Sequence, residues 1–264
     1  MKVLVTVKEV AEPEDDFEIS GLEIEEKFLE YDLNEWDDYA IEEAVQLKEE
    51  SDEDIEVVAV TIGPERSEET IRMALAKGAD RAVRVWDDAF EKGEVLDPNA
   101  KANVLAAVAD EEDPGLVFSG VQADDDSIGG TGVALADELG FQWAAVVNAF
   151  EYDAGDDVAR VHRELEGGVE EITEVDTPAV FTIQTGINEP RYASLRGIRQ
   201  AQSKEIAPKT LGDLGLDDSA IETPIQINEM YEPVSESDTE YIEGSAEDMA
   251  GEVAELLRNK GVAE

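Results

Sequence analysis

The chain has 264 residues, enough for one large α/β domain or for a domain with a sizeable extension. Its 67 acidic and 20 basic residues give a net charge of −47, which disfavours nucleic acid and anionic membrane surfaces as partners. The chain contains no cysteine and a single histidine, His162, which excludes disulfides, thiolate chemistry, most metal sites and histidine-based triads. It also lacks an apolar run of about 18 residues, so we expect no membrane insertion and a cytoplasmic location.

The acidic residues are spread through every predicted helix and loop and do not form a tail. A hydrophobic content of 42% and a clear periodicity argue against a disordered chain. We therefore interpret most of the acidic residues as the solvated surface of a folded, halophilic protein. In very high salt, screening leaves such a surface with little self-repulsion.

The first half of the chain alternates apolar strands with helices. An acidic, irregular stretch at residues 9–32 is predicted to be a loop with a short hairpin. Asn34, with Asp37 in the turn that follows, is typical of a capped helix start. Two further helices are expected to begin at Ser67 and Asp97. Strands are predicted at residues 2–7, 56–61, 82–86 and 116–119.

After Gly140 the pattern changes to consecutive strands with short polar or glycine turns. We expect these strands to be antiparallel additions to the sheet. The whole pattern predicts an α/β protein with a Rossmann-like, doubly wound and mostly parallel sheet. The added strands are predicted at residues 143–150, 158–165, 169–175 and 179–184.

Residues 116–136 predict a buried strand, a glycine-bearing loop and a helix. The unpaired N–H groups and the positive dipole end at such a helix start are suited to phosphate. Gly129 and Gly130 allow the backbone to approach an anion, and Thr131 adds a hydroxyl. Residues 124–126, all aspartate, should repel phosphate, so we expect the anion at residues 129–131. A purely structural glycine turn is the alternative.

Three loops follow strands of this predicted sheet, at residues 6–10, 61–63 and 120–131. Ligands of open parallel sheets bind beyond the carboxyl ends of the strands, so these loops should converge. Their convergence favours an adenine-nucleotide-like ligand. The GxGxxG fingerprint is absent, and so is a Walker lysine.

A locally basic stretch lies between Asn188 and Lys209, where only Glu189 and Glu205 are acidic. In a chain of this charge we interpret it as a docking surface for acidic groups, with Tyr192 and Leu195 as apolar anchors. The alternative is a basic helix that balances its own acidic surroundings. The basic residues are Arg191, Arg196, Arg199, Lys204 and Lys209.

The C-terminal part differs in pattern from the rest, and we expect a domain at residues 1–205 followed by an extended arm at residues 206–264. Residues 205–243 show little periodicity, whereas Ser245 and Asp248 predict a capping box for a last helix. This helix could wrap a partner subunit or pack back on its own domain. Its apolar residues are Met249, Val253, Leu256 and Leu257.

Several separated motifs resemble, in the right order, the β subunit of electron transfer flavoproteins. The most specific are Val161-His-Arg-Glu-Leu-Glu-Gly-Gly-Val-Glu170 and Thr177-Pro-Ala-Val-Phe-Thr182, a basic residue, an acidic–Gly–Gly turn and a Pro-led strand. Further resemblance lies in Asn188-Glu-Pro-Arg-Tyr-Ala-Ser-Leu195, Asn34 with Ala40-Ile-Glu-Glu-Ala-Val-Gln-Leu-Lys48, and Gln122-Ala-Asp-Asp-Asp126 with Thr131-Gly132.

The resemblance implies an electron-carrier subunit and not an enzyme. It implies a heterodimer with an α subunit that holds most of a redox-active FAD, and a structural AMP in an adenine nucleotide α-hydrolase-like fold of this chain. By position, the nucleotide would be surrounded by Thr6, Asn34, Glu35, Trp36, Asp37, Ile62, Gly120, Gln122, Ala123, Asp125, Asp126, Ser127, Ile128, Gly129, Gly130 and Thr131.

The resemblance also implies contacts with partners. Glu164 matches a family acid near the flavin that pairs with an arginine of the α subunit; the alternative is an ion pair with Arg163. Leu195 matches the anchor of the loop that docks acyl-CoA dehydrogenases, while the flavin domain swings to transfer electrons. Electrons would then pass to a membrane quinone oxidoreductase, as in fatty acid β-oxidation. No metal ligands are implied.

Two departures and two alternatives accompany the resemblance. Pro13 stands where the family commonly has a flavin-touching tyrosine, with Phe17 nearby, and Ile128-Gly-Gly130 replaces more polar residues, so AMP binding would rest on backbone contacts. Electron-bifurcating relatives bind a second FAD in place of AMP, typically with a different loop sequence. The other alternative is a stand-alone adenine-nucleotide-binding regulatory domain or an ATP-hydrolysing enzyme. The lack of a lysine or arginine within residues 120–132 argues against ATP turnover.

Overall fold

The computed structural model describes residues 1–92, 95–153, 155, 157–233 and 241–262. Contacts within the chain divide it into two compact units, Met1–Glu229 and Met230–Glu264. The first unit carries the sheet and all of the predicted nucleotide residues, and the second carries the last helix.

Within the described residues the first unit forms a nine-stranded sheet with the order β11-β10-β9-β12-β8-β1-β6-β7-β13. All neighbouring pairs from β9 to β13 are parallel, whereas β10 is antiparallel to both β9 and β11. The predicted mostly parallel, doubly wound sheet is therefore confirmed. The strands are β1 Lys2–Thr6, β6 Glu56–Ile62, β7 Arg81–Val85, β8 Leu116–Gly120, β9 Gln142–Asp153, β10 Val158–Leu165, β11 Val169–Asp176, β12 Ala179–Ile183 and β13 Ile206–Lys209.

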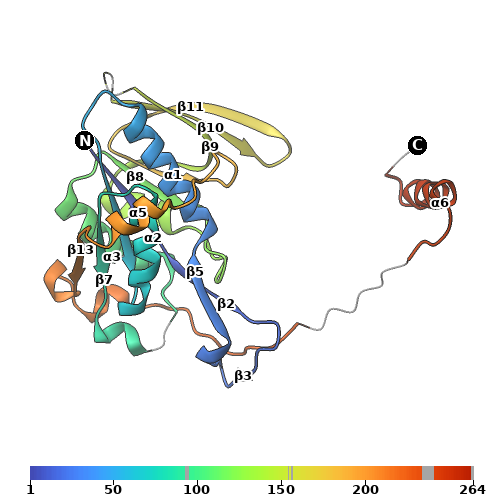
Figure 1. The fold of residues 1–264 in the computed structure, drawn as a ribbon, viewed down its shortest axis with the longest axis horizontal. Coiled ribbons are helices and arrows are strands. Elements are labelled where there is room, and N and C mark those ends of the chain that lie inside the picture. Colours follow the sequence, from blue (N-terminus) through green and yellow to red (C-terminus); the bar gives the residue numbers. More distant parts are fainter. Residues whose placement is uncertain (93–94, 154, 156, 234–240, 263–264) are drawn as a thin grey trace. The chain divides into compact units, whose positions relative to one another are not determined.

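Helices cover both faces of this sheet, as can be followed in Figure 1. One apolar cluster packs α1, α2 and α5 against one face, and a second packs α3 and α4 against the other. Phe118 and Phe181, from adjacent central strands, are fully buried and meet Phe150 edge to face. The helices are α1 Glu35–Glu50, α2 Glu68–Lys77, α3 Pro98–Glu112, α4 Thr131–Leu139 and α5 Leu195–Ala201, with short 3-10 turns at Glu26–Phe28, Glu65–Ser67, Asp88–Lys92, Gly212–Leu214 and Asp218–Ile221.

The prediction that all strands after Gly140 are antiparallel additions is wrong for β9, which is parallel to β12, and for β12 itself. This strand lies between β9 and β8 and is parallel to both. All five of its residues are buried, which is typical of a central strand that is covered on both faces. β10 and β11 are antiparallel, as expected, and they lie at the edge of the sheet.

The acidic stretch after β1 contains the expected hairpin. Strand β2, Glu9–Pro13, pairs with β5, Leu29–Leu33, and a smaller pair forms between β3, Ile19–Ser20, and β4, Glu23–Ile24. Arg66 stacks over the Tyr31 ring and forms an ion pair with Glu9, so contacts from the 3-10 turn at Glu65–Ser67 hold this hairpin.

The segment expected to start the arm belongs in part to the first unit. β13 extends the sheet beside β7, and Leu211 and Ile221 are buried in the cluster around α3. The compact unit therefore reaches Glu229, beyond the expected boundary at residue 205. In the second unit α6, Ala246–Asn259, begins with the predicted capping box of Ser245 and Asp248. The parts of the arm at residues 234–240 and 263–264 lie outside the described residues.

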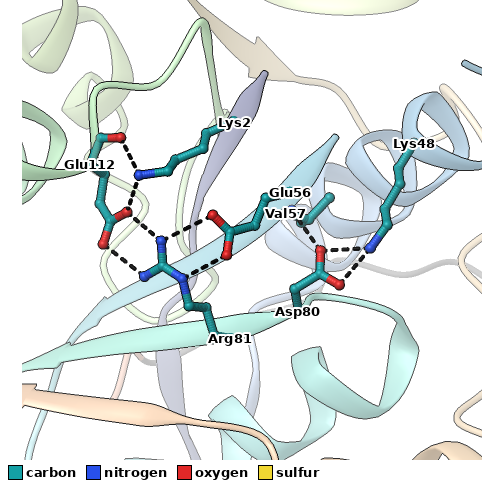
Figure 2. A network of polar contacts seen from close by, with 7 residues as sticks. All are labelled: Lys2, Lys48, Glu56, Val57, Asp80, Arg81 and Glu112. Atoms are coloured by element: carbon teal, nitrogen blue, oxygen red, sulfur yellow. Dashed lines mark hydrogen bonds and ion pairs between the residues drawn. The ribbon is translucent and has the colours of Figure 1, made fainter. Parts of the chain in front are cut away.

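A network of ion pairs lies at the amino ends of β1, β6 and β7 (Figure 2). The Arg81 guanidinium donates to the carboxylates of both Glu56 and Glu112, with a distance of 2.8 Å from Nε to Glu56 Oε1. Lys2 Nζ donates to Glu112 Oε2 at 3.0 Å. Hydrogen bonds from Arg81, and then from Lys2, outweigh burial and lower the pKa of Glu112 to about 2. This network joins three strands to the end of α3, away from the carboxyl ends of the strands.

Candidate functional site

A cavity of about 380 Å³ lies at the carboxyl ends of β1, β6 and β8. In the sheet, β1 lies between β6 and β8. The chain continues from β1 to β6 on one side, and β8 is added later on the other side. The cavity therefore lies at the point where the strand order reverses. This is where open parallel sheets bind their ligands. The predicted residues that line it are Thr6, Asn34, Asp37, Ile62, Gly120, Gln122, Ala123, Asp125, Asp126, Gly129 and Thr131.

The remaining predicted residues of the loops lie beside the cavity and do not line it. The backbone N–H of Glu35 and the indole N–H of Trp36 both donate to the carboxylate of Asp124. Ile128 is 43% exposed. The others that do not line the cavity are Ser127 and Gly130.

Sequence reasoning missed Lys101 and most of the apolar wall, whereas Lys8 lies in the loop at residues 6–10 that was expected to converge here. Lys101 and Leu105 come from α3, a helix that carried no expected role, and Lys8 follows β1. Their convergence depends on the strand order, which no local pattern specifies. The other missed lining residues are Val60, Val95, Leu96 and Ser119, while Val7 and Val121 belong to the loops expected to converge here.

Asn34 occupies the N-cap position of α1, but its side chain does not cap the helix. Its Nδ2 donates to the Gln122 carbonyl at 2.9 Å, and its Oδ1 accepts from the Asp124 N–H at 3.2 Å. The Glu35 N–H at the start of α1 is instead bound by Asp124, as described above. The predicted local cap is therefore replaced by a reciprocal clamp between the start of α1 and the loop after β8.

Asp37, expected to support that cap, joins two strand ends. Its Oδ2 accepts from the Lys8 N–H at 2.8 Å, and its Oδ1 accepts from the Gly120 N–H at 3.0 Å. A Cβ at position 120 would lie 2.5 Å from Asp37 Oδ1, so glycine permits the close approach of α1. Burial raises the pKa of Asp37 to about 7, against the opposing effect of the hydrogen bonds.

The start of α4 has the features that the sequence predicted for an anion site. Gly129 and Gly130 adopt φ angles of 64° and 83°, in the left-handed region that glycine tolerates. Gly130 is the N-cap, and no side chain caps the first turn. The N–H groups at Thr131 and beyond therefore lie at a glycine-lined edge of the cavity with the positive dipole end behind them.

The neighbouring aspartates are not free to repel a ligand in the way that the sequence suggested. Lys8 Nζ binds both Asp125 and Asp126, and Lys101 Nζ donates to Asp126 Oδ2 at 2.7 Å. Asp126 Oδ1 also accepts from the Ile128 N–H at 3.0 Å. Burial alone would raise the pKa of Asp126, but these hydrogen bonds outweigh it and lower the pKa to about 2. Asp126 is thus ionised, and Asp125 and Asp126 are paired with two lysines from outside residues 120–132.

In the docking surface expected between Asn188 and Lys209, the two apolar anchors are exposed, but most of the basic side chains are bound to other groups of the chain. Tyr192 is 98% exposed and Leu195 is 79% exposed, at and just before the start of α5. Arg191 is not free to bind a partner's acid, because its guanidinium binds Glu42 and Glu49 of α1.

Two other cations of the basic stretch are also occupied. Lys204 donates to the carbonyls of Leu75 and Ala79, and Lys209 binds Glu111. Arg196 and Arg199 are exposed and have no hydrogen-bond or ion-pair partner within the described part of the chain.

Glu164 lies on β10, away from the cavity. It is exposed and has no hydrogen-bond or ion-pair partner among the described residues. Its neighbour Arg163 forms an ion pair with Glu171 of β11 at 3.2 Å. The alternative ion pair between Glu164 and Arg163 is therefore not found.

Two searches of the described residues bear on other kinds of site. They contain no group of three or more histidine, aspartate or glutamate side chains that could hold a metal ion. Among them there is also no helix with the length and apolar character needed to cross a membrane.

Comparison with known proteins gives one consistent result. Residues 21–213 match the model of the electron transfer flavoprotein domain. The chain is 46% identical over 262 residues to the electron transfer flavoprotein subunit β of Methylophilus methylotrophus, covering 97% of this chain and 98% of that one. It is 40% identical to the subunit β of Bradyrhizobium diazoefficiens, covering 83% and 86%, and 38% identical to the mitochondrial subunit β of Arabidopsis thaliana, covering 88% and 90%.

The matched region contains the segment around Leu195 and the residues that line the cavity, except Thr6, Val7 and Lys8. The similarity to the first of these relatives extends over nearly the entire chain. The chain therefore belongs to the electron transfer flavoprotein family as a β subunit, an electron carrier and not an enzyme.

Proposed function

We propose that this β subunit holds a structural AMP in the cavity at the ends of β1, β6 and β8. The observation that carries the proposal is the uncapped, glycine-lined start of α4 at the edge of a cavity with an apolar wall. Its volume of about 380 Å³ lies within the range of about 300–1,000 Å³ that is typical of small-ligand sites. The phosphate would bind the N–H groups near Thr131, and Val60, Ile62 and Leu105 would pack against the base.

The β subunit would act together with an α subunit that carries most of the FAD. The flavin supplies the redox chemistry, and the protein supplies position and electrostatics. Glu164 supports this arrangement, because it is exposed and unpaired within the described residues and so is available to an arginine of the α subunit. The apolar residues of α6 support a role of the arm in the same contact, since Met249 and Val253 are 37% and 44% exposed.

The segment around Leu195 would dock the electron donor, in our proposal an acyl-CoA dehydrogenase-type enzyme, and electrons would pass on to a quinone oxidoreductase. The exposure of Tyr192 and Leu195 supports this role, together with the free guanidinium of Arg196. Arg191 contributes indirectly in this proposal, since its ion pairs with α1 fix the start of the segment.

Replacing Leu195 by alanine should slow electron acceptance from the donor dehydrogenase and leave the flavin content unchanged. Because Leu195 is 79% exposed, its removal costs little folding free energy, less than about 0.5 kcal/mol. Stopped-flow reduction of the heterodimer by the dehydrogenase measures the effect, and Val262→Ala, another exposed apolar residue, is the matched control. An unchanged rate for Leu195→Ala would exclude the docking role.

Nucleotide content tests the proposed function as a whole. The chain is co-expressed with its α subunit, purified in molar salt and denatured, and the released nucleotides are separated by chromatography. One FAD and one AMP per heterodimer are expected. Two FAD and no AMP would place the protein in the electron-bifurcating group, and a chain without flavin or partner would favour a regulatory nucleotide-binding domain.

Two further proposals concern the environment in which the protein works. We propose a cytoplasmic protein, although the relative from Arabidopsis thaliana is named as mitochondrial. We also propose a halophilic one, because the net charge of −47 is spread over the whole surface of a folded chain.

A further inference from the structure

The ion pairs at the mouth of the proposed nucleotide site form a compact charge cluster. Lys8 and Lys101 are the two cations that line the cavity, and Asp125 and Asp126 are the carboxylates that bind them. Lys8 Nζ and Lys101 Nζ both donate to the same oxygen, Asp126 Oδ2, at 2.9 and 2.7 Å. Both lysine ammonium groups that could bind a chain of phosphates are therefore paired with aspartate carboxylates.

The position of this cluster is fixed from three directions. Lys8 follows β1, Lys101 lies in α3, and Asp126 belongs to the loop between β8 and α4. The Asp126 side chain is only 19% exposed and that of Lys101 only 18%, so solvent screens the pair less than it would on the surface. Asp126 Oδ1 is held by the Ile128 N–H, which prevents the carboxylate from turning away from the lysines.

We propose that Asp126 limits this site to nucleoside monophosphates by occupying the ammonium groups of Lys8 and Lys101, which would otherwise bind the further phosphates of ADP and ATP. The inference rests on the proposed nucleotide function of the cavity. A single phosphate can be held by the N–H groups at the start of α4. Each additional phosphate adds about one negative charge and finds no free cation, because both lysines that line the cavity are bound to aspartates.

The site would thus select its ligand by a repulsive element as well as by an attractive one. An asparagine at position 126 keeps the shape of the side chain and an acceptor for the Ile128 N–H. It removes the charge, so that Lys101 becomes available to phosphate and Lys8 keeps only its ion pair with Asp125. The preference of the site for AMP over ADP should then become smaller. If Asp126 had a purely structural role, its replacement would lower the affinities for AMP, ADP and ATP alike.

The test uses the full chain in its complex with the α subunit. Radiolabelled AMP is bound and displaced by unlabelled AMP, ADP or ATP in equilibrium dialysis at fixed KCl. The wild type should favour AMP over ADP by about tenfold or more, and Asp126→Asn should reduce that ratio by about tenfold, the effect of one charge-assisted contact. The ADP affinity of the variant should also fall more steeply with added KCl.

Asp80→Asn is the matched control. Asp80 also binds a lysine, Lys48, and a backbone N–H, that of Val57, but it lies at the amino end of β7, away from the cavity. This variant should keep the wild-type preference. If Asp126→Asn fails to fold, Lys101→Met serves as a second variant, because it leaves Asp126 with one cation fewer and should strengthen the preference for AMP.

The outcomes separate the inference from the function on which it rests. AMP binding with an unchanged ratio in Asp126→Asn would overturn the inference and leave the proposed function intact. A wild type that does not prefer AMP over ADP would also overturn it. A wild-type complex that binds no labelled AMP would overturn the proposed function itself.

Discussion

The side chain of Asp37 holds the cavity at the ends of β1, β6 and β8 in shape. It lies in the first turn of α1 and accepts hydrogen bonds from the N–H groups of Lys8 and Gly120. Lys8 follows β1, and Gly120 is the last residue of β8. These are the two strands between which the strand order reverses. A buried carboxylate is costly unless it is hydrogen-bonded, and here both of its oxygens have partners. The residue therefore fixes the distance between a helix and the two strand ends that border the cavity.

Asp37 should make the folding stability depend on pH in an unusual direction. Burial raises the pKa of Asp37 from 3.8 to about 7. Between these two pH values the carboxyl group keeps its proton in the folded chain, whereas it loses it in the unfolded chain. This contribution to stability is present below about pH 4 and is lost as the pH rises to about 7. Relative to Asp37→Asn, the wild type should lose up to about 1.4 kcal/mol per pH unit across that window.

Urea unfolding of both proteins at fixed KCl, from about pH 4 to about pH 8, measures this difference. The variant supplies the control, since every other titrating group is shared. A constant difference between the two proteins over the window would show that Asp37 does not titrate in it.

At the scale of elements, the ion pairs of Figure 2 hold together the end of the sheet opposite the cavity. Arg81 on β7 joins Glu56 on β6 to Glu112 at the end of α3, so one guanidinium links a helix to two strands. Without it, the two carboxylates would face each other with only Lys2 to balance them. This arrangement makes the arginine more important than an isolated surface ion pair.

Arg81→Met should lower the free energy of unfolding by about 1–2 kcal/mol, between the values for exposed and buried pairs, because Arg81 is 22% exposed and Glu112 14%. The loss should also change with pH. The pKa of Glu112 is lowered from 4.5 to about 2, so its contribution is present above about pH 4.5 and is lost as the pH falls towards 2.

Urea unfolding of the wild type and Arg81→Met at neutral and acidic pH checks both expectations. Arg196→Met is the matched control, because Arg196 is exposed and unpaired within the described residues and should change stability by less than about 0.5 kcal/mol. Equal stability of Arg81→Met and Arg196→Met would contradict the structural role of the network.

At the scale of the whole molecule, the net charge of −47 is the dominant electrostatic feature. Most of the lysines and arginines that the structure describes form ion pairs with nearby carboxylates, as Arg81, Arg191 and Lys101 do. The acids that remain repel one another across a folded surface. Salt weakens this repulsion, because the Debye length falls to about 3 Å at 1 M ionic strength.

The thermal midpoint should therefore rise with salt. Raising KCl from about 0.1 M to about 2 M removes most of the long-range repulsion and should stabilise the folded chain. Thermal unfolding followed by circular dichroism measures the midpoint, and sucrose at matched osmolality distinguishes charge screening from general exclusion. A midpoint that is flat or falls with KCl would contradict a halophilic surface.

Much of the fold and part of the site could be predicted from the sequence. Apolar periodicity gave the alternation of strands and helices in the first half, and Gly129 and Gly130 indicated the uncapped helix start, because left-handed backbone is a local property of glycine. The capping box at Ser245 was predictable for the same reason. Such features depend on neighbouring residues alone.

The tertiary structure alone decided which distant side chains meet. Asn34 and Asp37 look like local caps, but strand order brings them to Gln122 and Gly120. Asp126 finds its partners 118 and 25 residues away, at Lys8 and Lys101. The parallel pairing of β12 could not be predicted either. The sequence of a short apolar strand indicates that the strand is buried, but it does not indicate which strands are its neighbours. The sequence therefore determined the elements and their local turns, whereas the charge balance of the cavity follows from long-range packing, which local periodicity does not encode.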